Sequence, residues 1–115
     1  MVRNVLLEQV DTIARPIIAV GNDYTDGHII PPHHHRRGQL ISGATGTMVM
    51  TTPLGRWVMP PQRGMWIPPG TTHDVRLLGA VAIQSLYLKP EIAGGMPAHC
   101  QVLGAPPRAY LKQNA

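Results

Sequence analysis

Glycine and proline punctuate this chain so often that the apolar stretches between them are short. Twelve glycines and twelve prolines make up about a fifth of the 115 residues, which is high but below the level that indicates disorder. About nine or ten of the intervening segments read as strands at a spacing of roughly eight residues, which is typical of a sandwich or barrel. We therefore predict an all-β fold with little helix.

The length fits one domain, and we predict that residues 1–115 form a single domain. Hydrophobic residues account for 43% of the sequence, which is enough for a core. The chain has no phenylalanine, two tryptophans and three tyrosines, so valine, isoleucine, leucine and methionine must supply most of the apolar volume. No internal repeat or second domain is visible.

Charge and cysteine content exclude several classes of function. Ten basic and six acidic residues give a net charge of +4, and the only adjacent basic pair, Arg36-Arg37, is predicted to be solvated. No basic helix or zinc finger is present, so we expect no direct binding of nucleic acid. A single cysteine, Cys100, favours a reducing compartment. Without a signal-peptide pattern or a run of membrane-spanning length, we predict a cytoplasmic protein with no membrane partner.

The strand pattern predicts specific pairings and ends. We expect 39–41 and 47–52 to pair as a hairpin through the glycines between them. The strand that begins at His28 is expected to end at Pro31, and 80–88 is the longest strand candidate. A helix is expected to start near Pro107, since proline is favoured in the first helical turn.

The histidines are concentrated in one stretch that glycines frame, from Gly27 to Gly46. In an extended strand, side chains alternate between the two faces, so His33 and His35 point the same way, about 6.6 Å apart. Two imidazoles at that spacing can converge on one metal ion. Gln39 can bring a further group to the same face after the intervening turn.

A third imidazole, His73, comes later in the chain, after a tight Pro-Pro-Gly loop. Three neutral imidazoles can hold Zn²⁺ and leave one position open for water or a ligand. The same set accepts nickel or iron, so we predict a divalent transition metal (zinc, nickel or iron) at His33, His35, Gln39 and His73. The alternative is that the histidines form a polar barrel mouth that binds no metal.

Glutamine at position 39 affects which exogenous ligand the site would prefer. The Gln39 side chain offers a neutral amide oxygen, a weaker metal donor than the carboxylate of a glutamate. A site with Gln39 is therefore one charge more positive than the same site would be with a glutamate at position 39. The missing negative charge weakens the binding of hard metals. We predict a small-molecule ligand and favour an anionic one.

Four aromatic or methionine side chains are candidates for the wall of a ligand pocket: Trp66, Tyr87, Met48 and Met50. The alternative is a plain core, which is the commoner role of aromatic side chains on short strands, whereas methionine offers a soft, adaptable wall. No catalytic residue is predicted, because no nucleophile elbow, phosphate loop or dinucleotide fingerprint is present. Asp74 carries a carboxylate in this region, but strand alternation points it away from His73.

The histidine stretch resembles the first sequence motif of the cupins, Gly-x5-His-x-His-x3-Glu-x6-Gly. Residues 27–46 match every spacing of this motif, with Gln39 in place of the glutamate. The resemblance implies a small double-stranded β-helix, the jelly-roll barrel of the cupins.

The second cupin motif, Gly-x5-Pro-x-Gly-x2-His-x3-Asn, is resembled by residues 62–77. Three of its positions match: Pro68, Gly70 and His73. Gln62 stands where the motif has glycine, and Leu77 stands where it has asparagine. We interpret Gly64, two residues later, as the residue that makes the turn instead.

The order of segments from about residue 13 to residue 105 is similar to the N-terminal sensor half of AraC-type transcription regulators. The segments that carry this resemblance are Arg36–Leu40, Thr51–Val58, Trp66–Val75, Leu86–Leu88 and Met96–Leu103. In that subgroup the position of Gln39 is commonly not glutamate. The resemblance implies effector binding and dimerisation. No residue here matches the family's DNA-recognition helices, so DNA binding is not carried over.

These features favour a metal-capable cupin domain that binds a small-molecule effector and forms a homodimer. Dimerisation also draws on the apolar segment Val2–Val20, which can form a sheet edge. The alternatives are a small stand-alone metal-dependent cupin enzyme, such as a three-histidine dioxygenase, and a dimerisation module with an empty site. The intact histidines favour the first two interpretations, and the missing acid–base residues favour the first and third.

Overall fold

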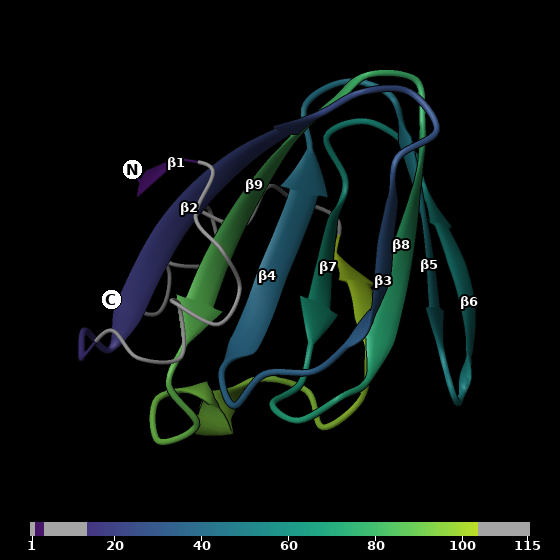
Figure 1. Ribbon diagram of the computed structural model, residues 1–115. Coiled ribbons are helices and arrows are strands. Elements are labelled where there is room, and N and C mark those ends of the chain that lie inside the picture. Colours follow the sequence, from purple (N-terminus) through teal and green to yellow (C-terminus); the bar gives the residue numbers. More distant parts are fainter. Residues whose placement is uncertain (1, 4–13, 104–115) are drawn as a thin grey trace.

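The computed structural model describes residues 2–3 and 14–103, which form two sheets packed face to face (Figure 1). The six-stranded sheet has the order β1 (Val2–Arg3), β2 (Ile17–Tyr24), β9 (Val81–Leu88), β4 (Gly38–Gly43), β7 (Gly64–Ile67) and β10 (Gln101–Leu103). The four-stranded sheet has the order β3 (Ile29–His33), β8 (His73–Leu78), β5 (Thr47–Thr52) and β6 (Gly55–Met59). A short 3-10 helix, η1 (Ala93–Gly95), is the one helical element among the described residues. The predicted all-β fold with little helix is confirmed.

Strand pairing is antiparallel throughout these sheets except between β1 and β2, which run parallel. The hairpin predicted between 39–41 and 47–52 is wrong, because β4 lies in the six-stranded sheet and β5 in the four-stranded one. β4 is buried along its whole length, and its two edges are taken up by β9 and β7. β5 pairs instead with β6 and β8. The turn after β4 therefore carries the chain from one layer to the other, as a jelly roll requires.

β3 continues through two prolines, so the predicted strand end at Pro31 is also wrong. It forms one edge of the four-stranded sheet, where a residue without an amide proton costs no ladder hydrogen bond on the open side. Its pairing with β8 shifts between Ile30 and His33, and this irregularity accommodates the prolines. Beyond the shift, His33 lies directly opposite His73.

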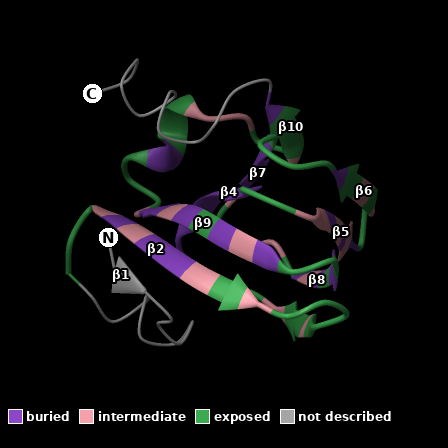
Figure 2. Cartoon of the chain, turned by 90° about the horizontal axis from the view of Figure 1, so that it is seen from above, coloured by how far each residue is buried: buried purple, intermediate pink, exposed green. Residues whose placement is uncertain are grey.

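The core lies between the two sheets, and Figure 2 shows buried bands alternating with less buried ones along β2 and β9. Its members are methionines and aliphatic residues: Ile41, Met48, Met50, Met59, Met65, Ile67, Val75, Leu77, Val81 and Ile83. Four of these ten residues are methionines. This confirms the expectation that aliphatic residues and methionine supply the apolar volume.

A second cluster covers the other face of the six-stranded sheet. It is centred on Trp66, which is fully buried against Leu40, Leu88, Ala93 and Leu103. The indole Nε1–H donates a hydrogen bond of 2.7 Å to the carbonyl oxygen of Pro97. The ring lies so close to Gly38 that a Cβ atom there would overlap it. Glycine at position 38 is therefore a steric requirement of this packing.

The turn before β7 contains an unusual backbone conformation. Gln62 has a φ angle of +67°, in the left-handed region that favours glycine. Its amide donates a hydrogen bond of 2.7 Å to the carbonyl oxygen of Gly43. The residue at the motif's glycine position therefore makes the turn itself. The interpretation that Gly64 takes over this role is wrong, because Gly64 lies within β7.

Two expectations concern parts of the chain that lie outside the described residues. These are the helix predicted to start near Pro107 and residues 4–13 of the N-terminal segment. In the part of the chain that the structure describes, no helix has the length and apolarity needed to cross a membrane.

Candidate metal site

Three elements bring the predicted histidines together at one end of the sandwich. His33 ends β3 and His73 begins β8, and the two lie opposite each other in the pairing of these strands. His35 lies in the loop that leads from β3 to β4 and thus from one sheet to the other. The layer crossing places His35 between the two sheets, where its ring is buried.

The three rings converge. Their nearest ligand nitrogens all lie within 4.8 Å of one another. The ring centroids are 4.3 Å apart for His33 and His73, 5.2 Å for His35 and His73, and 5.8 Å for His33 and His35. In a tetrahedral site with zinc–nitrogen bonds of about 2.0–2.1 Å, ligand nitrogens are about 3.4 Å apart. Coordination of one ion would therefore need the rings to move closer together by about 1 Å.

Main-chain carbonyl groups select the tautomer of each ring. The Nδ1 atoms of the three histidines lie 2.7–2.8 Å from carbonyl oxygens: His33 from Pro31, His35 from Arg37, and His73 from Thr71. A carbonyl oxygen can only accept, so each Nδ1 carries the proton and each Nε2 presents a lone pair. Metal-ligating histidines are usually oriented by such a bond from the other ring nitrogen. The local backbone thus prepares three donor atoms of the same kind.

The protonation state of His73 suits metal binding at neutral pH. Burial lowers the pKa of His73 to about 4, and the nearby His33 and His35 act in the same direction. The hydrogen bond to Thr71 acts the other way but is the weaker influence. His73 is therefore uncharged at neutral pH and keeps its lone pair available.

Gln39 lies beside the histidines, at the predicted fourth position. Its Oε1 is 3.2 Å from Nε2 of His35, while its Nε2 donates to Ser85 Oγ at 2.9 Å and to Tyr87 Oη at 3.1 Å. The two hydroxyl groups orient the amide so that its oxygen is turned toward the imidazoles. Gln39 Oε1 and the unprotonated Nε2 of His35 are both acceptors, so neither can donate a hydrogen bond to the other. A cation in contact with both atoms would satisfy them. The donor set therefore fits a divalent metal ion.

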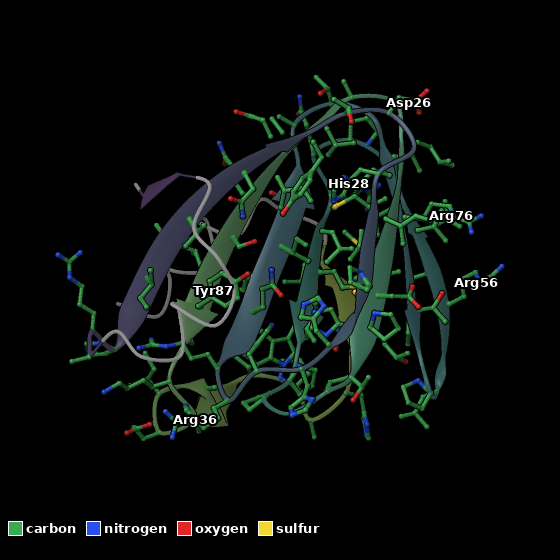
Figure 3. The ribbon with its side chains drawn as sticks, viewed as in Figure 1. Asp26, His28, Arg36, Arg56, Arg76 and Tyr87 are labelled. Atoms are coloured by element: carbon green, nitrogen blue, oxygen red, sulfur yellow. The ribbon has the colours of Figure 1, made fainter. Side chains whose placement is uncertain are left out.

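A cavity of about 20 Å³ adjoins these side chains. His33, Gln39, His73 and Tyr87 are among the residues that line it. This volume holds an ion or about one water molecule and is too small for an organic effector. Figure 3 labels Tyr87 on β9 and Arg36 at the lower end of the sandwich, where the loop before β4 lies.

The other predicted pocket residues have different places. Met48 and Met50 face the interior and belong to the core, away from the cavity wall. Trp66 is on the far side of the six-stranded sheet, because side chains alternate along β7 and its neighbours Met65 and Ile67 point inward. Of the four candidates, Tyr87 is the one that lines the cavity.

Several residues around the site were not anticipated from the sequence. Ser85 lies two residues before Tyr87 on the same face of β9, a relation that strand periodicity could have indicated. Asn22 and Tyr24 line the cavity from β2, and only the pairing of β2 with β9 places them there. Arg37 was expected to be solvated but is buried, and its guanidinium donates to the carbonyl oxygen of Pro16 at 3.1 Å.

The remaining histidines lie away from this cluster. His34 is exposed, whereas the next residue, His35, is buried. The ring of His28 lies 4.8 Å from that of Tyr24, near the upper end of the molecule in Figure 3. His99 is exposed in the segment before β10.

Comparison with known proteins identifies sequence relatives. The AraC-like ligand binding domain family matches residues 16–114 of the chain. The HTH-type transcriptional regulator NimR of Escherichia coli (strain K12) is 35% identical over 83 residues. That alignment covers 72% of this chain but only 30% of the regulator, so the similarity concerns one part of the larger protein.

Solved structures share the fold at low sequence identity. A cupin superfamily protein from Desulfitobacterium hafniense matches with a TM-score of 0.62 at 14% identity, over 67% of this chain and 71% of that protein. Oxalate decarboxylase from Bacillus subtilis matches with a TM-score of 0.59 at 15% identity, over 70% of this chain and 23% of the enzyme. KdgF from Halomonas sp. matches with a TM-score of 0.57 at 19% identity, over 65% of this chain and 72% of that protein. These likenesses concern the architecture, which is that of the cupins.

Proposed function

Because the chain belongs to the AraC-like ligand binding domain family, we propose that it is a sensor domain that holds a divalent metal ion and binds a small-molecule effector. His33, His35 and His73 supply the metal ligands, with Gln39 as a weak fourth donor. The observation that carries the proposal is the cluster of three histidines, whose ligand nitrogens lie within 4.8 Å of one another and whose Nδ1 atoms are each held by a main-chain carbonyl group.

Three neutral imidazoles and an amide oxygen place no negative charge around the ion. Zinc, nickel and iron all accept such donors. When bound, the metal would offer an open coordination position to an exogenous ligand. A small anion is the favoured ligand there, because none of the protein donors neutralises the charge of the ion.

Binding is better supported than acid–base catalysis. The described residues that line the cavity include no aspartate, glutamate or lysine, and Asp74 lies on the alternate face of β8 from His73. A three-histidine dioxygenase would leave most of its chemistry to iron and oxygen, so the identity of the bound metal separates these two functions.

A role in transcription regulation and a homodimeric state complete the proposal. Support for the first is the similarity to one part of the regulator from E. coli, which points to a cytoplasmic sensor. Support for the second is the family membership and the place of β1 (Val2–Arg3), which is the edge strand of the six-stranded sheet among the described residues. Sedimentation at high micromolar concentration tests the dimer, and a purely monomeric species would contradict it.

The metal content of protein purified without a histidine tag or a metal column tests the central claim. We expect one transition-metal ion per chain, measured by inductively coupled plasma mass spectrometry, and its loss on His35→Ala. His34→Ala is the matched control and should keep the metal, since His34 is exposed and outside the cluster. Metal-free protein that also fails to take up added zinc, nickel or iron would overturn the proposal. One iron ion per chain together with oxygen consumption would instead favour the alternative function, a three-histidine dioxygenase.

A further inference from the structure

A cleft of about 450 Å³ lies at the open side of the sandwich, separate from the small cavity at the histidines. Its walls come from β5 and β6 of one sheet and from the segment just before β10 of the other. β6 and β10 are the last strands of their sheets, so the cleft lies where the two layers part. Its volume is within the range of about 300–1,000 Å³ typical of small-molecule sites.

The floor of this lateral cleft reaches the core. Trp57 and Cys100 line the cleft, and both are partly buried against the core cluster. Leu54, by contrast, is 86% exposed at its rim. An occupant would therefore contact an indole face and cover an apolar side chain that is now in water.

The lining also limits the charge of the occupant. Apart from Trp57 and Leu54, it consists of prolines, small residues, three threonine hydroxyl groups, the Cys100 thiol and one imidazole, that of His99. Among the described residues, no lysine, arginine, aspartate or glutamate lines it. A charged molecule would lose hydration here without gaining an ion pair, whereas an uncharged molecule can pair with the hydroxyl groups.

One loop separates the lateral cleft from the histidines. Pro68, Gly70, Thr71 and Thr72 line the cleft with one side of this loop. On the other side, the Gly70 amide donates a hydrogen bond of 2.9 Å to the carbonyl oxygen of His35, and the Thr71 carbonyl oxygen accepts the 2.8 Å bond from His73 Nδ1. Any movement of this loop would change the orientation of His73 and the position of His35 together.

We propose that the lateral cleft binds an uncharged, largely apolar small molecule, and that its occupancy changes the metal affinity of the histidine centre through residues 68–72. The coupling rests on the proposed metal site, whereas the binding of the small molecule does not. An occupant that packs against Thr71 alters the bond that orients His73, and by linkage the metal must alter the affinity for the occupant by the same factor.

The test uses the neutral fluorescent probe N-phenyl-1-naphthylamine, which emits strongly in apolar surroundings, with and without zinc. We expect saturable binding with energy transfer from Trp57. Ala98→Trp, which fills the cleft from an exposed position, should weaken probe binding about tenfold or more. Ala44→Trp, also at an exposed position but outside the cleft, is the control and should leave it unchanged. Zinc should shift the probe dissociation constant about fivefold or more in the wild type.

The outcomes separate the two proposals. Probe binding that Ala98→Trp weakens and zinc shifts supports both parts of the inference. Absent binding, or binding that Ala98→Trp leaves unchanged, overturns the cleft as a site. Binding that is weakened by Ala98→Trp but unaffected by zinc, in protein shown to hold zinc, overturns the coupling. If the chain takes up no zinc, the metal proposal fails together with the coupling, and the response to Ala98→Trp alone decides whether the cleft binds.

Discussion

The two faces of the six-stranded sheet carry different kinds of side chain, although they belong to the same strands. On the inner face, Gln39 and Tyr87 form a hydrogen-bonded polar group beside the histidines. On the outer face, their neighbours Leu40 and Leu88 pack around Trp66. The inner face thus carries part of the candidate metal site and packs against the methionine-rich core, whereas the outer face is apolar packing around one indole.

This difference shows how a small domain can separate stability from binding. Because the pleat has a period of two, consecutive residues can serve the two tasks independently. Changes on the outer face should therefore alter the free energy of unfolding, and changes at the inner polar group should alter metal affinity. The four predictions below test this separation, from the largest expected effect to the smallest.

Gly38→Ala should lower the free energy of unfolding by about 3 kcal/mol, because the new Cβ overlaps the buried Trp66 ring and the strand must shift. Denaturant unfolding of metal-free protein measures the effect. Gly94→Ala is the matched control, since nothing lies near a Cβ built there, and it should be close to neutral. Equal stability of both variants would show that the outer face is less tightly packed than described.

Acid should destabilise the metal-free protein through His73. The pKa of this ring is about 4 in the folded state and near 6.5 when it is exposed, so the unfolded chain binds more protons between these values. The stability contributed by neutral His73 is present above pH 6.5 and is lost as pH falls toward 4, by about 3 kcal/mol in total. Unfolding in a chelator at several pH values measures this loss.

His73→Gln removes the titrating ring and serves as the control for that experiment. The variant should show a clearly smaller dependence of stability on pH between 6.5 and 4. If the free energy of unfolding depends on pH equally in both proteins, the acid sensitivity comes from groups other than His73.

Gln39→Glu should raise the affinity for zinc about tenfold, or about 1.4 kcal/mol, because a carboxylate adds a negative charge to the donor set. Ser85 and Tyr87 now accept from the amide, but their hydroxyl groups can instead donate to the new oxygen. Competition with a chromophoric chelator measures the affinity. Unchanged or weaker binding would indicate that the group at position 39 does not reach the metal.

Gln62→Gly should raise the free energy of unfolding by about 0.5 kcal/mol. The left-handed conformation strains glutamine but not glycine, and the greater freedom of glycine in the unfolded chain offsets part of the gain. Gln84→Gly, at an exposed strand position with an ordinary backbone conformation, is the control and should be destabilising. If both changes destabilise the protein to the same extent, the strain at Gln62 is negligible.

The histidine set was predictable because its pattern is local. His33 and His35 are two residues apart, and His73 follows a motif whose spacing identifies it without knowledge of the fold. Gln39 was found in the same way. The wall residues Asn22 and Tyr24 were not found, because only the pairing of β2 with β9 brings them to the cavity.

The wrong predictions concern features that depend on how the two sheets are arranged in space. The predicted hairpin between 39–41 and 47–52 followed a local turn signal, but burial on both faces assigns β4 to the middle of the other sheet. Trp66, a candidate for the pocket wall with a plain core as the alternative, packs on the outer face of the sheet, and the sequence does not show which face of a strand is turned to the barrel interior. Gln62 stands where the second cupin motif has glycine. Only the structure shows that it adopts the left-handed backbone conformation that favours glycine.

Sequence alone determined the fold class, the family resemblance and the donor atoms, because short strands and fixed spacings are properties of neighbouring residues. Tertiary structure decided which face Trp66 covers and where a larger molecule can bind. These depend on side chains and edge strands that come together only when two sheets pack, whereas the carbonyl groups that orient the histidines are two residues away along the chain. The 20 Å³ cavity and the 450 Å³ cleft on either side of one loop belong to that second kind of information.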